Sequence, residues 1–228
     1  MKRKLSERVD NECKEIISDL KHPSYESVMQ LINNRQSFFL KEVLDNSFKD
    51  VNLMNDDSLL MRACKVGDEE CTKLLIAHGA DVSFVSHYSG HTALTLACRY
   101  GHESIVKLLL EHGAEVNADD NVLPLVEACE GGNSAVVELL LNSGARVNEH
   151  PQMLCEDPEC HGHYHDEGTH YHDAPNALMV ASDKGYTAIV ALLLKHGADV
   201  GIELKRLSSD DFFTEGFTAL TFASQGYR

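Results

Sequence analysis

Residues 108–116 read Leu-Leu-Leu-Glu-His-Gly-Ala-Glu-Val, and this phrase decides the fold because the chain repeats it. Related phrases, each ending in Gly-Ala-x-Val, occupy residues 74–82, 139–147 and 192–200. Their glycines lie 34, 31 and 53 residues apart, and the last spacing is one period plus an insertion of about twenty residues. Periods of this length indicate stacked units that cannot bury their apolar faces alone. The sequence therefore predicts a solenoid whose function is to bind something.

A second phrase precedes each of these. Residues 92–98 read Thr-Ala-Leu-Thr-Leu-Ala-Cys, and similar wording stands at 58–64, 123–129 and 176–182. Each begins with Ser, Thr or Asn, or has Pro just inside, and a glycine follows, which is typical of a short capped helix. A second helix with apolar residues at three- to four-residue spacing should follow and end at a glycine such as Gly113. Each unit is thus predicted to contain two helices.

Together the two phrases resemble the ankyrin repeat, closely over residues 58–201, in wording nearest to long multi-ankyrin scaffold proteins. The resemblance implies an all-α ankyrin-repeat solenoid of antiparallel helix pairs with finger loops. In the family, a histidine of the Thr-Pro-Leu-His tetrapeptide often ties neighbouring repeats together. We therefore expect apolar packing to carry more of the stacking here, because other residues occupy that position: Met61, Thr95, Val126, Met179 and Thr221.

The repeat phase divides the chain into segments. They are a polar N-terminal tail or helix (1–23), a degenerate capping repeat (24–57), repeats 1 to 3 (58–91, 92–122, 123–148), a Cys/His-rich insertion (149–174), repeat 4 (175–201), a short insertion (202–213) and the start of a further repeat (214–228). A first helix without its second would leave Leu220 and Phe222 poorly covered. We therefore expect this chain to be a fragment of a longer protein.

Composition favours an intracellular domain. No run of eighteen apolar residues is present, so membrane insertion is not predicted. Cys64, Cys98 and Cys129 share one position in their repeats, directly after an alanine. Small buried side chains suit that position, so these three are expected to be core thiols in a reducing compartment, the cytoplasm or the nucleus.

The net charge of −16 is concentrated in the middle of the chain. Residues 111–173 contain fourteen Asp and Glu against a single basic residue, Arg146. Such a field repels nucleic acid and anionic lipid and attracts basic peptides. We therefore expect a protein or peptide partner, whose binding a basic segment of the partner would favour, and no nucleic acid. An acidic surface that only aids solubility explains the charge equally well. The oligomeric state stays open.

The insertion carries the one constellation suited to metal chemistry. Two His-Tyr-His triplets, at 163–165 and 170–172, flank a four-residue loop and predict a β-hairpin. Pairing His165 with His170 would place all four imidazoles on one face, at distances that one ion can bridge. With the thiolates upstream, this predicts a structural zinc ion bound chiefly by Cys155 and Cys160 together with two of the following histidines: His161, His163, His165, His170 and His172. The alternative is a disordered His-rich loop that binds metal only adventitiously.

Three function classes were compared. A zinc hydrolase needs an open coordination position and a nearby base in a site that excludes water, which a hairpin does not offer. Catalysis is therefore not predicted. The first hypothesis is a non-catalytic scaffold for protein–protein interaction; the alternative is a metal- or redox-responsive regulatory module whose Cys/His loop controls partner binding.

The resemblance also implies where a partner binds. In the family the concave groove of fingers and first helices usually takes the partner. Arg99 and Tyr100 are predicted to include the energetic anchors, because aromatic and Arg side chains dominate hot spots. The exposed positions implied by phase are Arg62, Lys65, His87, Tyr88, His91, Leu96, Arg99, Tyr100, Glu127, Glu130, Val180 and Asp183.

Overall fold

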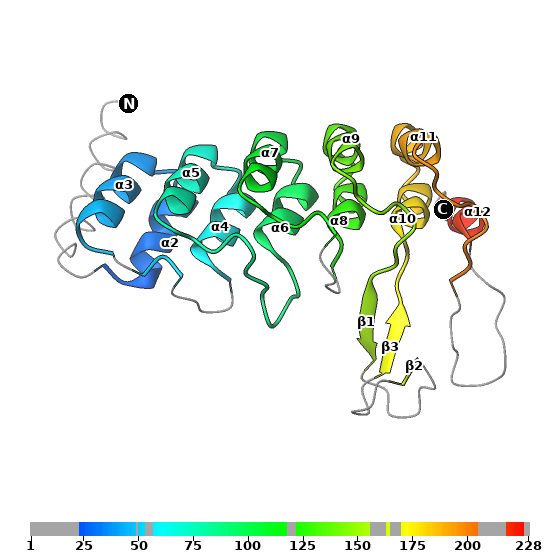
Figure 1. The fold of residues 1–228 in the computed structure, drawn as a ribbon, viewed down its shortest axis with the longest axis horizontal. Helices are drawn as coiled ribbons and strands as arrows, with labels where there is room; N and C mark the ends of the chain where they lie inside the picture. Colours follow the sequence, from blue (N-terminus) through cyan, green and yellow to red (C-terminus); the bar gives the residue numbers. More distant parts are fainter. Residues whose placement is uncertain are drawn as a thin grey trace, which may run out of the picture.

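The computed structural model describes residues 23–48, 50–52, 57–117, 122–155, 163–164, 170–204 and 218–225, and only the backbone of residues 152–155, 163–164 and 170–173. Its helices lie in two parallel rows (Figure 1). The first row contains α2 (Tyr25–Asn33), α4 (Leu59–Val66), α6 (Ala93–Arg99), α8 (Pro124–Glu130), α10 (Ala177–Asp183) and α12 (Ala219–Gln225). The second row contains α3 (Ser37–Asn46), α5 (Glu69–Ala77), α7 (Glu103–Glu111), α9 (Ser134–Asn142) and α11 (Thr187–Lys195). The predicted helical solenoid is confirmed.

The short first helices begin at the capping residues that the sequence indicated. The Ser58 hydroxyl accepts a hydrogen bond from the Met61 N–H at 3.2 Å, which satisfies one of the free donors at the start of α4. Asn176 caps α10 in the same way. In α6, Thr92 and Thr95 each cap the backbone N–H of the other, forming a capping box. Local sequence therefore sets where these helices start.

Small side chains form the contact between neighbouring first helices. Ala97 and Cys98 of α6 are fully buried, and so are the equivalent alanine and cysteine of α4 and α8. In α10 the equivalent Ala181 is fully buried and Ser182 is 9% exposed. Burial raises the pKa of Cys64 and Cys129 to about 12, and the pKa of Cys98 is also well above its usual value because it is buried. The predicted core position of these three thiols is confirmed, and they remain protonated at neutral pH.

Asparagine side chains tie successive repeats together beside the helices. The Asn117 Nδ2 donates to the carbonyl oxygen of Gly144 at 2.9 Å, and its Oδ1 accepts from the Arg146 N–H at 2.8 Å. Asn52 and Asn148 make the same pair of hydrogen bonds to the repeats that follow them. A side-chain amide can bridge a backbone acceptor and donor at once. Polar side chains therefore do tie neighbouring repeats together, but from these asparagine positions and not from the position of the family's histidine.

The junction between repeats 1 and 2 differs from the others. Ser83 occupies the position, directly after a valine, at which three other repeats have Asn52, Asn117 and Asn148. Its backbone N–H and its hydroxyl both donate to the Asp81 carboxylate of its own repeat, at 2.9 and 2.7 Å. Serine is too short to reach the next repeat, so this junction lacks the asparagine tie among the residues described.

The insertion after repeat 3 projects away from both helix rows (Figure 1). It contains the strands β1 (Gln152–Cys155), β2 (His163–Tyr164) and β3 (His170–Asp173) in an antiparallel sheet of order β1-β3-β2. Its base is fixed by the Ala174 N–H, which donates to the Pro151 carbonyl oxygen at 2.8 Å. The insertion is thus an extended arm joined to the stack between α9 and α10.

Several predicted segments lie outside the described part of the chain. These are most of the N-terminal tail, the greater part of the short insertion and the last residues. Within α12, Leu220 is 79% exposed whereas Phe222 packs partly buried against the core. In the part of the chain that the structure describes, no helix has both the length and the apolarity needed to cross a membrane.

Candidate protein-binding face

The first helices α4, α6, α8 and α10 are largely enclosed, because each of them packs between the first helices of its two neighbours. Of α6, residues 93–98 are all buried and only the C-terminal end is exposed. Consequently only a narrow stripe of first-helix surface faces solvent. We call this stripe, together with the finger at residues 85–92, the finger-side face.

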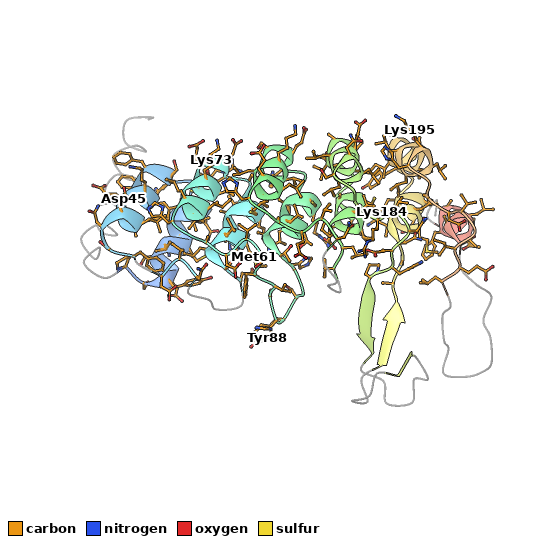
Figure 2. All side chains as sticks on the ribbon, in the orientation of Figure 1. Asp45, Met61, Lys73, Tyr88, Lys184 and Lys195 are labelled. Carbon is orange, nitrogen blue, oxygen red and sulfur yellow. The ribbon has the colours of Figure 1, made fainter. Side chains whose placement is uncertain are left out.

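The finger is a small hairpin. Val85 and Thr92 form an antiparallel bridge, and the Ser86 N–H donates to the His91 carbonyl oxygen at 2.9 Å. Tyr88 lies at the tip, away from the helices, and is 84% exposed (Figure 2). His87 beside it is also exposed. The finger therefore presents an aromatic side chain that the fold itself does not use for packing.

Arg99 and Glu127 form an ion pair that links α6 to α8. The Arg99 Nη1 donates to the Glu127 Oε2 at 2.8 Å, and Glu127 is only 8% exposed. The hydrogen bond to Glu127 raises the pKa of Arg99 further above its usual value. A charge-assisted hydrogen bond to a nearly buried carboxylate stabilises the junction and fixes the guanidinium in place. Arg99 is therefore exposed but already paired.

Three residues predicted to be exposed are buried instead. Leu96 is 6% exposed, Glu127 8% and Val180 7%. Counting positions along a repeat identifies the helix face, but stacking by both neighbours covers all of that face except the last turn. The prediction of exposure is wrong for these three.

His91 occupies the base of the finger, half-buried. Its Nδ1 lies 3.3 Å from the Thr95 hydroxyl of α6. Burial lowers the pKa of His91; the charge of Glu127 acts in the opposite direction, and Arg99 acts with burial. His91 is thus in the field of residues from two repeats, although it is not exposed as fully as predicted. The sequence did not lead us to expect that Thr95 contacts His91 and completes the capping box. Its position three residues after the Thr92 cap could have indicated the capping box.

The charges on the stripe are only partly paired. Arg62 and Lys65 on α4 form no ion pair with any residue that the structure describes. Further along, the Lys184 Nζ lies 3.2 Å from the Glu130 Oε2, which links α10 to α8. Asp183 beside it is exposed. Lys184 was not predicted as a site residue, but it neutralises Glu130, which was predicted.

Tyr100 ends α6 and is the largest exposed side chain on the stripe. It is 48% exposed, and its ring stacks on that of His102 with centroids 6.4 Å apart. Tyr100 therefore lies at the turn from α6 to α7. Around the base of the finger, the charges of Lys65, Arg99 and Glu127 all act on His91, so predicted residues from three repeats lie near one another. Whether they bind a partner remains a prediction.

The arm at residues 152–173 differs from its prediction in register. In the sheet His163 pairs with Tyr171 and Tyr164 pairs with His170. The predicted pairs, His163 with His172 and His165 with His170, are therefore wrong by one residue. A shift of one residue moves every position of one strand to the opposite face relative to its partner strand, because strand residues alternate. The four imidazoles are not all on one face, since positions 163 and 170 lie on opposite faces.

The same sheet pairs Cys155 of β1 directly with His170 of β3, and Met153 with His172. Positions 155, 170 and 172 consequently share one face. Cys160, His161 and His165 lie outside the described residues, and so do the side chains of the strands. Over the side chains that are described, no group of three or more metal-binding residues is found. The zinc prediction is not tested by this structure.

Comparison with known proteins agrees with the geometry. A family model described as ankyrin repeats (3 copies) matches residues 24–120 and 60–151, and a single ankyrin repeat model matches residues 176–203. No curated protein matches the chain.

Proposed function

The chain belongs to the ankyrin repeat family, and we propose that it is a non-catalytic scaffold that binds a peptide or protein on the finger-side face. Repeats of this family generally mediate protein–protein interaction. To assign the binding site, one surface of this chain must be identified as the one that contacts the partner.

Exposed aromatic side chains on a rigid support carry the proposal. Tyr88 and Tyr100 project from a finger and from a helix end whose backbones are held by hydrogen bonds and by buried helices. Tyrosine buries a large area at low entropic cost, which makes it an effective anchor. Between them the Arg99–Glu127 pair holds a guanidinium in a fixed position.

A displayed peptide library tests this proposal. A random dodecapeptide library would be panned on the intact chain, and enriched peptides would be measured against the Tyr88→Ala/Tyr100→Ala double variant. We expect loss of binding of about tenfold or more, because hot-spot truncation typically costs over 1 kcal/mol per residue. Phe38→Ala is the matched control, since Phe38 is 72% exposed on α3 in the other row. Enriched peptides that bind the double variant unchanged would refute the placement, and so would a library that yields no binders.

We also propose that zinc organises the arm, with Cys155 and His170 as one ligand pair. The β1–β3 register supports this pair, because directly opposed residues have Cβ atoms about 5 Å apart, within reach of one ion. Cys160 and one further histidine of the predicted set would complete a tetrahedral site. The arm contains few apolar residues around which to fold, so a metal ion would supply its stability.

Elemental analysis and a chelator melt test the zinc proposal. We expect about one zinc per chain, lost in a Cys155→Ser/Cys160→Ser variant. Removing zinc should loosen the arm while the repeat stack survives, because neighbouring repeats stabilise each other independently of the arm. Less than about a tenth of an equivalent of tightly bound zinc would refute the site.

The alternative is a regulatory module in which this Cys/His arm controls partner binding. It predicts that peptide affinity for the finger-side face changes when zinc is added or removed, whereas a plain scaffold keeps its affinity. The free thiols in the repeats fit a reducing compartment, the cytoplasm or the nucleus: Cys64, Cys71, Cys98 and Cys129 are all unpaired and buried.

A further inference from the structure

Two cations on the finger-side face have no ion-pair partner in the part of the chain that the structure describes, although the net charge of the chain is −16. Arg62 and Lys65 lie one turn apart on α4 and make no ion pair with any described residue. The Nε of Arg62 is moreover buried and has no hydrogen-bond acceptor in the described part of the chain. A buried donor without an acceptor is unfavourable. This end of the stripe therefore suits an acidic group from outside.

The sign of the unpaired charge changes along the stripe. At its centre, Arg99 is neutralised by Glu127 at 2.8 Å. At α8 and α10, Lys184 is neutralised by Glu130 at 3.2 Å. Asp183 on α10 is exposed and has no ion-pair partner among the described residues. Among the described residues, Arg62 and Lys65 thus outnumber the single carboxylate of Asp57 at α4, the pairs in the middle are neutral, and Asp183 is negative at α10.

We propose that this face binds an extended peptide segment of mixed charge, acidic where it crosses α4 and basic where it crosses α10. This inference rests on the proposed function and specifies its partner. Neighbouring packed helices have axes about 9 Å apart, so α4 and α10 are separated by three such steps, about 27 Å. An extended chain rises about 3.3 Å per residue, so about eight residues separate the two charged ends of the segment.

A uniformly charged segment fits less well. A basic segment would be attracted by the acidic stretch at residues 111–173, but it would meet Arg62 and Lys65 at the other end of the face. A uniformly acidic segment would be repelled by that same acidic stretch. Only a segment whose charge changes sign matches both ends, and the like-charge contacts select against binding in the reversed direction.

The peptides enriched on the intact chain test the inference. We expect them to carry Asp or Glu toward one end and Lys or Arg toward the other, about eight residues apart. Lys65→Glu should weaken their binding by about tenfold or more, because it turns an attraction into a repulsion. Lys107→Glu is the matched control, with the same change of charge on α7, where Lys107 is 52% exposed and pairs with Glu103. Binding to the double variant Lys65→Glu/Asp183→Lys should be recovered by peptides in which the two charges are exchanged.

The outcomes separate this inference from the function on which it depends. Peptides that lose binding with Tyr88→Ala/Tyr100→Ala but show no charge pattern, and that tolerate Lys65→Glu, would overturn the inference and leave the binding face intact. Peptides that are indifferent to both sets of variants would overturn both proposals. Equal weakening by Lys65→Glu and Lys107→Glu would reveal a general effect of net charge and would also overturn the inference.

Discussion

Replacing Gly131 with alanine separates local from tertiary effects, because the two predict opposite signs. Gly131 ends α8 with φ −73° and ψ −13°, a helical conformation that alanine adopts freely. At such a position alanine usually stabilises a protein by about 0.4–1 kcal/mol, because it restricts the unfolded chain. From its backbone conformation alone, Gly131→Ala should therefore be stabilising.

Packing reverses this expectation. A Cβ atom built on Gly131 would lie 2.0 Å from the carbonyl oxygen of Arg99, whereas ordinary contacts begin at 3.4 Å. The obstacle is backbone of the neighbouring repeat and cannot rotate away. Either α6 and α8 separate by more than an ångström or the last turn of α8 distorts. Overpacking of this kind costs about 1–3 kcal/mol, which leaves a net loss of up to about 2.5 kcal/mol after the gain from the unfolded chain.

Urea unfolding followed by circular dichroism measures the effect. We expect the Gly131→Ala midpoint to fall and, in hydrogen exchange, the amides of α6 and α8 to lose more protection than those of α4. Gly201→Ala is the control, since Gly201 also lies outside the left-handed region and, among the described residues, its Cβ would meet only the Asp199 carboxylate, at 3.3 Å. A Gly131→Ala protein as stable as the parent, or more stable, would show that the repeats are not in this close contact.

The asparagine ties, the finger base and the buried thiols can each be tested as well. Asn117→Ala should lower the free energy of unfolding by about 1–2 kcal/mol, because it removes the tie to the next repeat. Ser83→Asn should raise the free energy of unfolding by up to about 1 kcal/mol by forming the missing tie. Urea midpoints measure both effects, and a Ser83→Asn protein that is less stable than the parent would contradict the second prediction. In the folded state the pKa of His91 is below its ordinary value of 6.5, so as the pH falls the unfolded chain binds the proton first and stability decreases below pH 6.5. His91→Gln should therefore flatten that part of a curve of stability against pH. Equal slopes for the parent and the variant would contradict the prediction. Four of the seven cysteines should not react with a thiol reagent until denaturant is added, because they are buried: Cys64, Cys71, Cys98 and Cys129. Rapid reaction of more than three cysteines in the native protein would contradict their burial.

The repeat architecture could be predicted because its signals are local. Thr92 and Ser58 specify helix starts through hydrogen bonds to residues three positions away. Gly113 follows the end of α7 with φ +88°, as its place after the leucines indicates, because a residue with a side chain rarely adopts that conformation. Four copies of such signals, with intervals of 34 and 31 residues and one interval lengthened by an insertion, leave little freedom in how the units stack.

The binding face could be predicted only in part. Tyr88 and Tyr100 are exposed as expected. Glu127 is not, since it pairs with Arg99 across a junction between repeats. Periodicity assigns a residue to a face of its own helix, but it does not show how far the neighbouring helix covers that face. The register of the arm was wrong for a related reason, because a four-residue loop and a shorter or longer one suit the triplets at 163–165 and 170–172 equally well.

The sequence by itself therefore determined the repeat, its helices and the buried alanine and cysteine positions, because each depends on contacts within a few residues or on a period that recurs. The tertiary structure alone decided how repeats are joined and what their shared face presents. The Asn117 tie reaches a backbone 27 residues away, and Arg99 reaches Glu127 across 28 residues. Such contacts depend on the distance between stacked helices, which is set by packing of the whole solenoid and is not encoded in any single repeat.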